Sequence, residues 1–138
     1  MERTLVLIKP DGVARALIGT IIHRFEQRGF EITALKLMRL SHEQAELHYH
    51  EHIGKPFFDH LIQFITSGPL IAMIVQGDHA IKLVRAMIGA TNPVDAQAGT
   101  IRGDFATVMA HNVVHGSDSV ASAEREIKIF FKQDEIFG

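Results

Sequence analysis

The pattern of apolar and polar residues predicts alternating strands and helices. Short, mostly apolar runs indicate strands, and apolar residues three or four positions apart indicate helices. Four short runs rich in apolar and β-branched residues have the length of strands, at residues 4–8, 30–40, 70–75 and 112–115. In the second run the inward positions are expected to be Ile32, then Ala34 or Leu35, then Leu37. The third run is apolar throughout, which is typical of a strand buried on both faces.

Between these runs the apolar residues recur at helical spacing. Ile18, Ile21, Ile22 and Phe25 lie on one stripe, and Gly29 is placed to end that helix. The tetrapeptide S-H-E-Q at residues 41–44 has the spacing of a capping box and predicts a helix from there to about residue 52.

Three more helices follow later in the chain. Pro56 suits the first turn of one, and Asp78 is the expected N-cap of another that Gly89 ends. Either Ser119 or Ser122 begins the last. The inner stripes are expected to be Ile81, Val84 and Ile88 in the helix before Gly89, and Ile127, Phe130 and Phe131 in the last helix.

The resulting order is strand, helix, strand, helix pair, strand, helix, strand, helix. It contains the βαββαβ pattern, with a helical hairpin inserted and a helix added at the end. We therefore predict an α+β, ferredoxin-like fold with a four-stranded antiparallel sheet, formed by one domain over residues 1–138. Residues 90–104 show no clear periodicity, and a loop of this length is usually functional or involved in assembly.

Composition narrows the function classes. The chain is 46% hydrophobic and 22% charged with a net charge of −2, which gives no sign of a surface for nucleic acid or for an anionic membrane. The absence of cysteine excludes disulfides, thiolate catalysis and cysteine metal sites. The first residues run directly into a strand, leaving no room for a signal peptide, and the longest apolar runs are too short to span a membrane. We expect a cytoplasmic protein.

The strongest candidate for chemistry is His115. It ends a β-branched run and is followed by Gly116, which allows a sharp turn and keeps bulk away from the imidazole. Ser117, Asp118 and Ser119 suit the start of the helix that follows. The alternative is a structural or surface role, which most of the nine histidines are expected to have.

No P-loop or G-x-G-x-x-G motif is present. If the protein binds phosphate, individual side chains must hold it. The candidate cations are Lys9, Arg85 and Arg102, and the candidate hydrogen-bonding helpers are Tyr49, Thr91 and Asn112. Arg102 is flanked by small residues and is expected to be presented for a bidentate grip on phosphate. Lys9 can instead be a solvated lysine at a strand end, and Arg85 can instead serve the C-terminal end of its helix.

Two other features have alternative interpretations. Phe57 and Phe58 are adjacent, so one is expected outside the core, where it can stack on a flat base. His48 and His52 are four residues apart on one helix face, which favours a metal site, but no third ligand is spaced to join them. We expect that pair to lie on a solvated helix face.

The sequence around His115 resembles the active-histidine signature of the nucleoside diphosphate kinase family, N-x-x-H-G-S-D, at residues 112–118. The similarity covers essentially the whole chain. It includes I-K-P-D-G at residues 8–12, K-P-F-F at 55–58, S-G-P at 67–69, G-A-T-N-P at 89–93 and G-T-I-R-G-D at 99–104.

This resemblance implies roles for single residues. His115 matches the residue that becomes phosphorylated, and Ser117 and Glu126 match the pair that supports it. Phe57 matches the aromatic residue that stacks on the base. The residues that match those around the phosphates and sugar are Lys9, Tyr49, Arg85, Thr91, Arg102 and Asn112.

The implied reaction moves the γ-phosphoryl group of a nucleoside triphosphate, typically ATP, to a ribo- or deoxyribonucleoside diphosphate. It runs by a ping-pong mechanism through phosphohistidine. Mg²⁺ is expected to arrive on the nucleotide phosphates, with no metal cage of protein ligands. The resemblance also implies a homo-oligomer of dimers, a hexamer in preference to a tetramer; residues 90–104 and a helix exposing Phe25 are expected interfaces. The alternative is a nucleotide-binding regulatory module without turnover.

Overall fold

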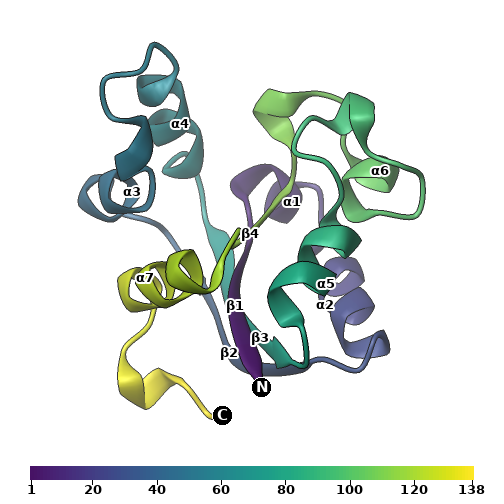
Figure 1. Cartoon of the computed structure of the whole chain (residues 1–138). Coiled ribbons are helices and arrows are strands. Elements are labelled where there is room, and N and C mark those ends of the chain that lie inside the picture. Colours follow the sequence, from purple (N-terminus) through teal and green to yellow (C-terminus); the bar gives the residue numbers. More distant parts are fainter.

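The computed structural model describes residues 1–138 and has an antiparallel sheet at its centre with helices on both faces (Figure 1). The strands are β1 (Glu2–Ile8), β2 (Glu31–Met38), β3 (Leu70–Gly77) and β4 (Val114–Gly116). They lie in the order β2-β3-β1-β4, so β1 is flanked by the third and fourth strands. This is the sheet of the βαββαβ pattern, and the predicted fold class is confirmed.

The helices follow the predicted order with two short additions. They are α1 (Pro10–Ala14), α2 (Ile18–Gln27), α3 (His42–His48), α4 (Phe58–Ile65), α5 (Ala80–Ile88), α6 (Ile101–Phe105) and α7 (Val120–Phe130). In Figure 1, α3, α4 and α7 lie to the left of the sheet, and α2, α5 and α6 lie to its right. None of these helices is both long and apolar enough to cross a membrane.

The alternation of β1 divides the core into two layers. Val6 and Ile8 belong to an apolar cluster that is completed by α2 and α5, whereas Leu5 and Leu7 belong to one completed by α3, α4 and α7. His115 pairs with Leu7 across the antiparallel ladder, so its side chain lies on the same face as Leu7. The register thus places this imidazole between the sheet and the α3–α7 layer.

Several helix ends confirm the sequence analysis. Ser41 forms the predicted capping box with Gln44. Ser119 is the N-cap of α7, since its hydroxyl accepts a hydrogen bond from the Ser122 amide at 3.0 Å. Gly89 ends α5 with a φ of 92°, a conformation that suits glycine.

Other boundaries differ from the prediction. The expected turn after Lys9 is the short helix α1, because Pro10 takes its first position and needs no amide partner there. Helix α3 ends at His48, and the residues up to His52 form a separate 3₁₀ turn. The span 90–104 contains the 3₁₀ turn Pro93–Asp95 and most of α6.

The N-cap of α5 is His79 rather than Asp78. His79 has a φ of 56°, and its side chain makes no capping bond. The carboxylate of Glu2, distant in sequence, accepts a hydrogen bond from the Ile81 amide at 3.1 Å. Glu2 of β1 therefore accepts one of the free amide hydrogens at the start of α5. Local spacing in the sequence does not reveal this contact.

The second strand and α2 also differ from expectation. A register irregularity between Ile32 and Ala34 selects Ala34 as the buried residue and leaves Leu35 and Leu37 51% and 61% exposed. Phe25 was expected to be exposed for an interface, but it is fully buried in the layer between α2 and the sheet. The apolar surface on this part of the molecule belongs to β2 and not to Phe25.

Candidate active site

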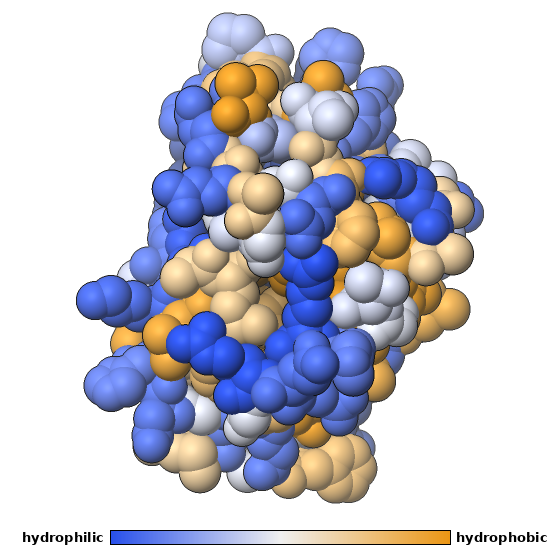
Figure 2. Space-filling view, turned by 90° about the vertical axis from the view of Figure 1, so that its right-hand side faces the viewer, coloured by the Kyte–Doolittle hydropathy of each residue, from blue (hydrophilic) through white to orange (hydrophobic).

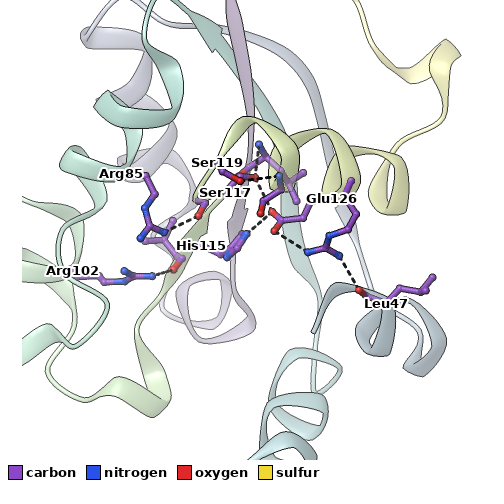
Figure 3. Close-up of polar contacts among 12 residues, drawn as sticks. Leu47, Arg85, Arg102, His115, Ser117, Ser119 and Glu126 are labelled. Carbon is purple, nitrogen blue, oxygen red and sulfur yellow. Dashed lines mark hydrogen bonds and ion pairs between the residues drawn. The ribbon is translucent and has the colours of Figure 1, made fainter. Parts of the chain in front are cut away.

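The imidazole of His115 is held by a buried carboxylate. Its Nε2 lies 2.8 Å from Oε1 of Glu126, and the Ser117 hydroxyl donates to the same oxygen at 2.7 Å (Figure 3). Glu126 comes from α7, whose buried side packs with Leu5 and Leu7 of β1. Because a carboxylate accepts the Nε2 proton, the lone pair of the neutral ring is on Nδ1. No hydrogen bond of the protein engages Nδ1.

Burial determines the charge of His115. It lowers the pKa of the imidazole below 6.5, and the hydrogen bond and charge of Glu126 offset only part of that effect. The ring is therefore neutral at pH 7. A neutral imidazole with one nitrogen fixed and the other free is a nucleophile that needs no additional base.

His115 lines a polar pocket of about 140 Å³. Tyr49, Arg85 and Glu126 line the same pocket, so three of the residues implied by the resemblance lie beside the imidazole. Arg85 donates to the Gly116 carbonyl at 3.2 Å and also borders the hollow that contains Thr91. This geometry places a cation between the histidine and that hollow.

Lys9 and Asn112 form a second polar group. Lys9 Nζ donates to Oδ1 of Asn112 at 2.8 Å, and the Asn112 amide donates to the Thr91 carbonyl at 3.1 Å. Burial, and next the charge of Arg102, lower the pKa of Lys9 to about 8. Lys9 is therefore half-buried, and its ammonium is charged and hydrogen-bonded at neutral pH rather than freely solvated.

Arg102 is presented differently from the prediction. It is 5% exposed, and its guanidinium donates to three carbonyls: those of Asn112 at 3.3 Å, Gly89 at 3.2 Å and Val114 at 2.6 Å. Burial, and next the charge of Arg85, lower its pKa to about 10. Arg102 therefore stabilises the backbone around β4. Three of its five N–H groups are used in this way, and two remain for a ligand.

Phe57 and Phe58 divide as expected. Phe57 is 45% exposed at the start of α4, whereas Phe58 packs against the core. Phe57 also borders a hollow of about 1030 Å³, which Lys9 and Met109 line with it. The exposed ring is thus available as a flat surface for a base, beside a cation.

His48 is not on a solvated face. It is 5% exposed, and its ring meets the edges of His115 and Tyr49 at centroid distances of 4.7 Å, and that of Phe130 at 5.5 Å. Burial, and next His115, lower its pKa well below 6.5. His52 lies against Tyr49 and Phe57, at centroid distances of 6.1 and 5.3 Å, and lines the same pocket. The histidine that His48 meets is His115.

Folding brings His48 close to two other potential metal ligands, His115 and Glu126, which are distant from it in the sequence. Ligand atoms of His48, His115 and Glu126 all lie within 4.8 Å of one another. Two ligand atoms of a tetrahedral zinc with bonds of about 2.0–2.2 Å lie roughly 3.4 Å apart, so ligand atoms separated by up to 4.8 Å are too far apart for a formed site. Its present contacts are those of packed rings and a hydrogen-bonded carboxylate.

Arg125 is a site residue that the sequence analysis missed. Its guanidinium lies 3.6 Å from Oε2 of Glu126 and donates to the Leu47 carbonyl at 3.0 Å (Figure 3). Adjacent residues of a helix point in different directions, so the sequence gives no reason to expect a contact between Arg125 and Glu126. The contact of Arg125 with the Leu47 carbonyl depends on the packing of α3 against α7.

The chain is similar to known proteins over nearly its whole length. The family model described as nucleoside diphosphate kinase matches residues 2–136. The nucleoside diphosphate kinase of Methanocaldococcus jannaschii is 60% identical over 136 residues, covering 99% of this chain and 97% of that protein. The same enzyme from one strain of Thermus thermophilus is 58% identical over 136 residues and covers 99% of each chain.

Solved structures give the same result. The nucleoside diphosphate kinase of Halobacterium salinarum, in complex with CDP, has a TM-score of 0.97 and 50% identity, covering 99% of this chain and 91% of that one. A Babesia bovis structure of the same family has a TM-score of 0.98 and 45% identity, covering 100% and 93%. The fold, the polar pocket and these similarities agree, and the chain belongs to the nucleoside diphosphate kinase family.

Proposed function

We propose that this protein transfers the γ-phosphoryl group of a nucleoside triphosphate, typically ATP, to a nucleoside diphosphate through a phosphohistidine on His115. The observation that carries the proposal is the fixed Nε2 of His115, which leaves an unshared pair on Nδ1 facing a polar pocket. A regulatory module that only binds nucleotide has no need for this tautomer. Family membership over residues 2–136 also favours the enzyme.

In the first half-reaction Nδ1 attacks the γ-phosphorus. The N–P bond forms while the bond to the bridging oxygen breaks, and the departing nucleoside diphosphate keeps that oxygen. Positive charge that develops on the ring is shared with Nε2–H, which Glu126 holds at 2.8 Å. The second diphosphate reverses these steps, which gives ping-pong kinetics.

The cations next to this path supply the charge that phosphoryl transfer requires. Lys9, Arg85 and Arg102 neutralise the phosphates in our proposal. The hydrogen-bonding partners for the phosphates and sugar are Tyr49, Thr91 and Asn112. Phe57 stacks on the base without reading its edge, so nucleotides with different bases are all expected to bind.

Mg²⁺ is the divalent ion that we propose, bound mainly by phosphate oxygens of the nucleotide. The proposed phosphate partners Lys9, Arg85 and Arg102 are cations and cannot coordinate a metal, which fits an ion that arrives with its own oxygen ligands. When bound, Mg²⁺ adds further neutralisation of the phosphates.

We also propose a single domain over residues 1–138 that assembles into a homo-oligomer, a hexamer in preference to a tetramer. Support comes from the exposed Leu35 and Leu37 on the edge strand β2 and from Val94, which is 80% exposed in the span 90–104. The face formed by α2, α5 and α6 carries apolar patches broken by charged side chains (Figure 2). Analytical ultracentrifugation tests the assembly, and a monomer would contradict it.

The decisive experiment is brief exposure to γ-labelled ATP. The protein is expected to acquire one acid-labile, alkali-stable phosphate that mass spectrometry maps to His115 and that GDP removes. His115→Ala is expected to acquire none. Transfer to GDP without a labelled protein would refute the mechanism. Cell fractionation tests the cytoplasmic location that we propose from the cytoplasmic pools of its substrates.

A further inference from the structure

Glu126 has two oxygens with different partners, and the second oxygen identifies a further functional residue. Oε1 accepts from both His115 and Ser117, at 2.8 and 2.7 Å. Oε2 faces the guanidinium of Arg125, at 3.6 Å from Nη2. The side chain of Glu126 is only 6% exposed, so a cation beside it contributes more than it would at the surface.

The same guanidinium also reaches the opposite helix. Nη1 of Arg125 donates at 3.0 Å to the Leu47 carbonyl. Leu47 lies in the last turn of α3, where carbonyls have no partner within the helix. Arg125 therefore joins the carboxylate that holds His115 to the end of the helix that precedes Tyr49.

The segment beyond Leu47 carries much of the proposed nucleotide site. His48 packs against the His115 ring, Tyr49 lines the pocket with it, and Phe57 follows at the start of α4. Arg125 bridges Glu126 on α7 and Leu47 on α3, the two residues labelled at the right of Figure 3. A shift of α3 relative to α7 would move these residues away from the imidazole.

We propose that Arg125 is a positioning residue for phosphoryl transfer. Its guanidinium fixes α3 relative to the Glu126–His115 pair, and with α3 it fixes the α3–α4 hairpin, which carries Tyr49 and Phe57. The planar fork of arginine can contact two acceptors in different directions, which the single ammonium of lysine cannot do at these two places. This inference rests on the proposed phosphohistidine mechanism.

Two substitutions separate the two contacts. Arg125→Lys keeps a positive charge near Glu126 but loses the fork, and Arg125→Gln keeps a donor for Leu47 but loses the charge. Each is expected to lower the single-turnover rate of His115 phosphorylation at saturating ATP by about tenfold, a typical effect of losing one charge-assisted contact. The apparent Kd for ATP is expected to rise in both, because the hairpin loosens.

The matched control is Arg3→Ala. It removes another arginine–glutamate pair of α7, between Arg3 and Glu124 at 3.6 Å, and is expected to leave both constants unchanged. A double-mutant cycle with Glu126→Gln tests the route. If Arg125 acts through its charge beside Glu126, Arg125→Gln, which removes that charge, adds little further loss of rate to Glu126→Gln.

Three results would overturn the inference: wild-type rates in Arg125→Lys, a fall in Tm with unchanged rate and Kd, or additive losses in the cycle. They differ from a failure of the proposed function, in which the wild-type protein itself acquires no phosphate on His115. Labelling of the wild type is therefore measured first.

Discussion

Lys9 and Asn112 lie in contact, with 2.8 Å between Nζ and Oδ1, although 103 positions separate them in the chain. The contact joins the end of β1 to the residues that lead into β4, and it holds a half-buried ammonium near the histidine strand. Burial lowers the pKa of that ammonium to about 8, which makes its charge dependent on pH within an accessible range.

We expect kcat/KM to decline as the pH rises through about 8, because Lys9 then loses the charge that we assign to phosphate binding. Lys9→Arg is expected to move this decline to higher pH, since a guanidinium stays protonated. A decline that remains near pH 8 in Lys9→Arg would assign it to another group. Steady-state rates at low substrate from pH 6 to about pH 10 measure the effect.

Lys9 also affects stability. Its pKa is about 8 in the folded chain against 10.5 for the free side chain, so between these values the unfolded chain binds more protons. The contribution of Lys9 to the free energy of unfolding therefore increases with pH across this window. Urea unfolding of Lys9→Met is expected to lack that contribution, and an unchanged pH dependence would contradict it.

On the acid side, kcat/KM is expected to fall only below pH 6.5. Burial lowers the pKa of His115, so the nucleophile stays neutral until the solution is more acidic than a free histidine requires. NMR titration of the His115 ring protons measures this pKa directly. A midpoint above 6.5 would show that Glu126 outweighs burial.

Glu126→Gln tests the tautomer. A carboxamide can donate to Nε2, which would move the ring proton to Nδ1 and remove the nucleophilic pair, as an amide does beside a catalytic histidine. The phosphorylation rate is expected to fall on the order of 10²-fold or more. Glu124→Gln, on the same helix with a half-exposed side chain, is the control and is expected to retain full activity.

The sequence was sufficient for elements that depend on local spacing. The capping box at Ser41, the inner stripe of α5 and the end of α5 at Gly89 all follow from neighbours in the chain, and all are confirmed. The fold class also followed, because few topologies accommodate βαββαβ. Local rules therefore predicted most of the fold.

Features that depend on distant partners were not predictable. His48 faces inward because α3 packs on β4 and α7, and the cap of α5 comes from Glu2. Arg102 is occupied by carbonyls whose positions only the folded chain sets. The resemblance named the pocket residues, but it gave no basis for the role that we propose for Arg125.

Phe57→Ala is expected to weaken binding of nucleotides with different bases to a similar extent. Loss of one stacking ring costs about 1–3 kcal/mol, which corresponds to roughly 5- to 150-fold in Kd. Isothermal titration with ADP, GDP and CDP measures this. Since Phe57 is 45% exposed, the Tm of this variant is expected to change little, whereas Phe58→Ala removes core packing and lowers Tm. A loss confined to one base would contradict stacking.

The guanidinium of Arg102 has a further consequence, because two of the three carbonyls that it holds belong to Asn112 and Val114 around β4. This strand has three residues and pairs with β1 alone, so it has few backbone bonds of its own to resist opening. A phosphate that draws on Arg102 also secures that arginine in place. The residues around His115 are thus expected to exchange their amide hydrogens more slowly when nucleotide is plentiful. The concentration of substrate then affects how often β4 separates from β1.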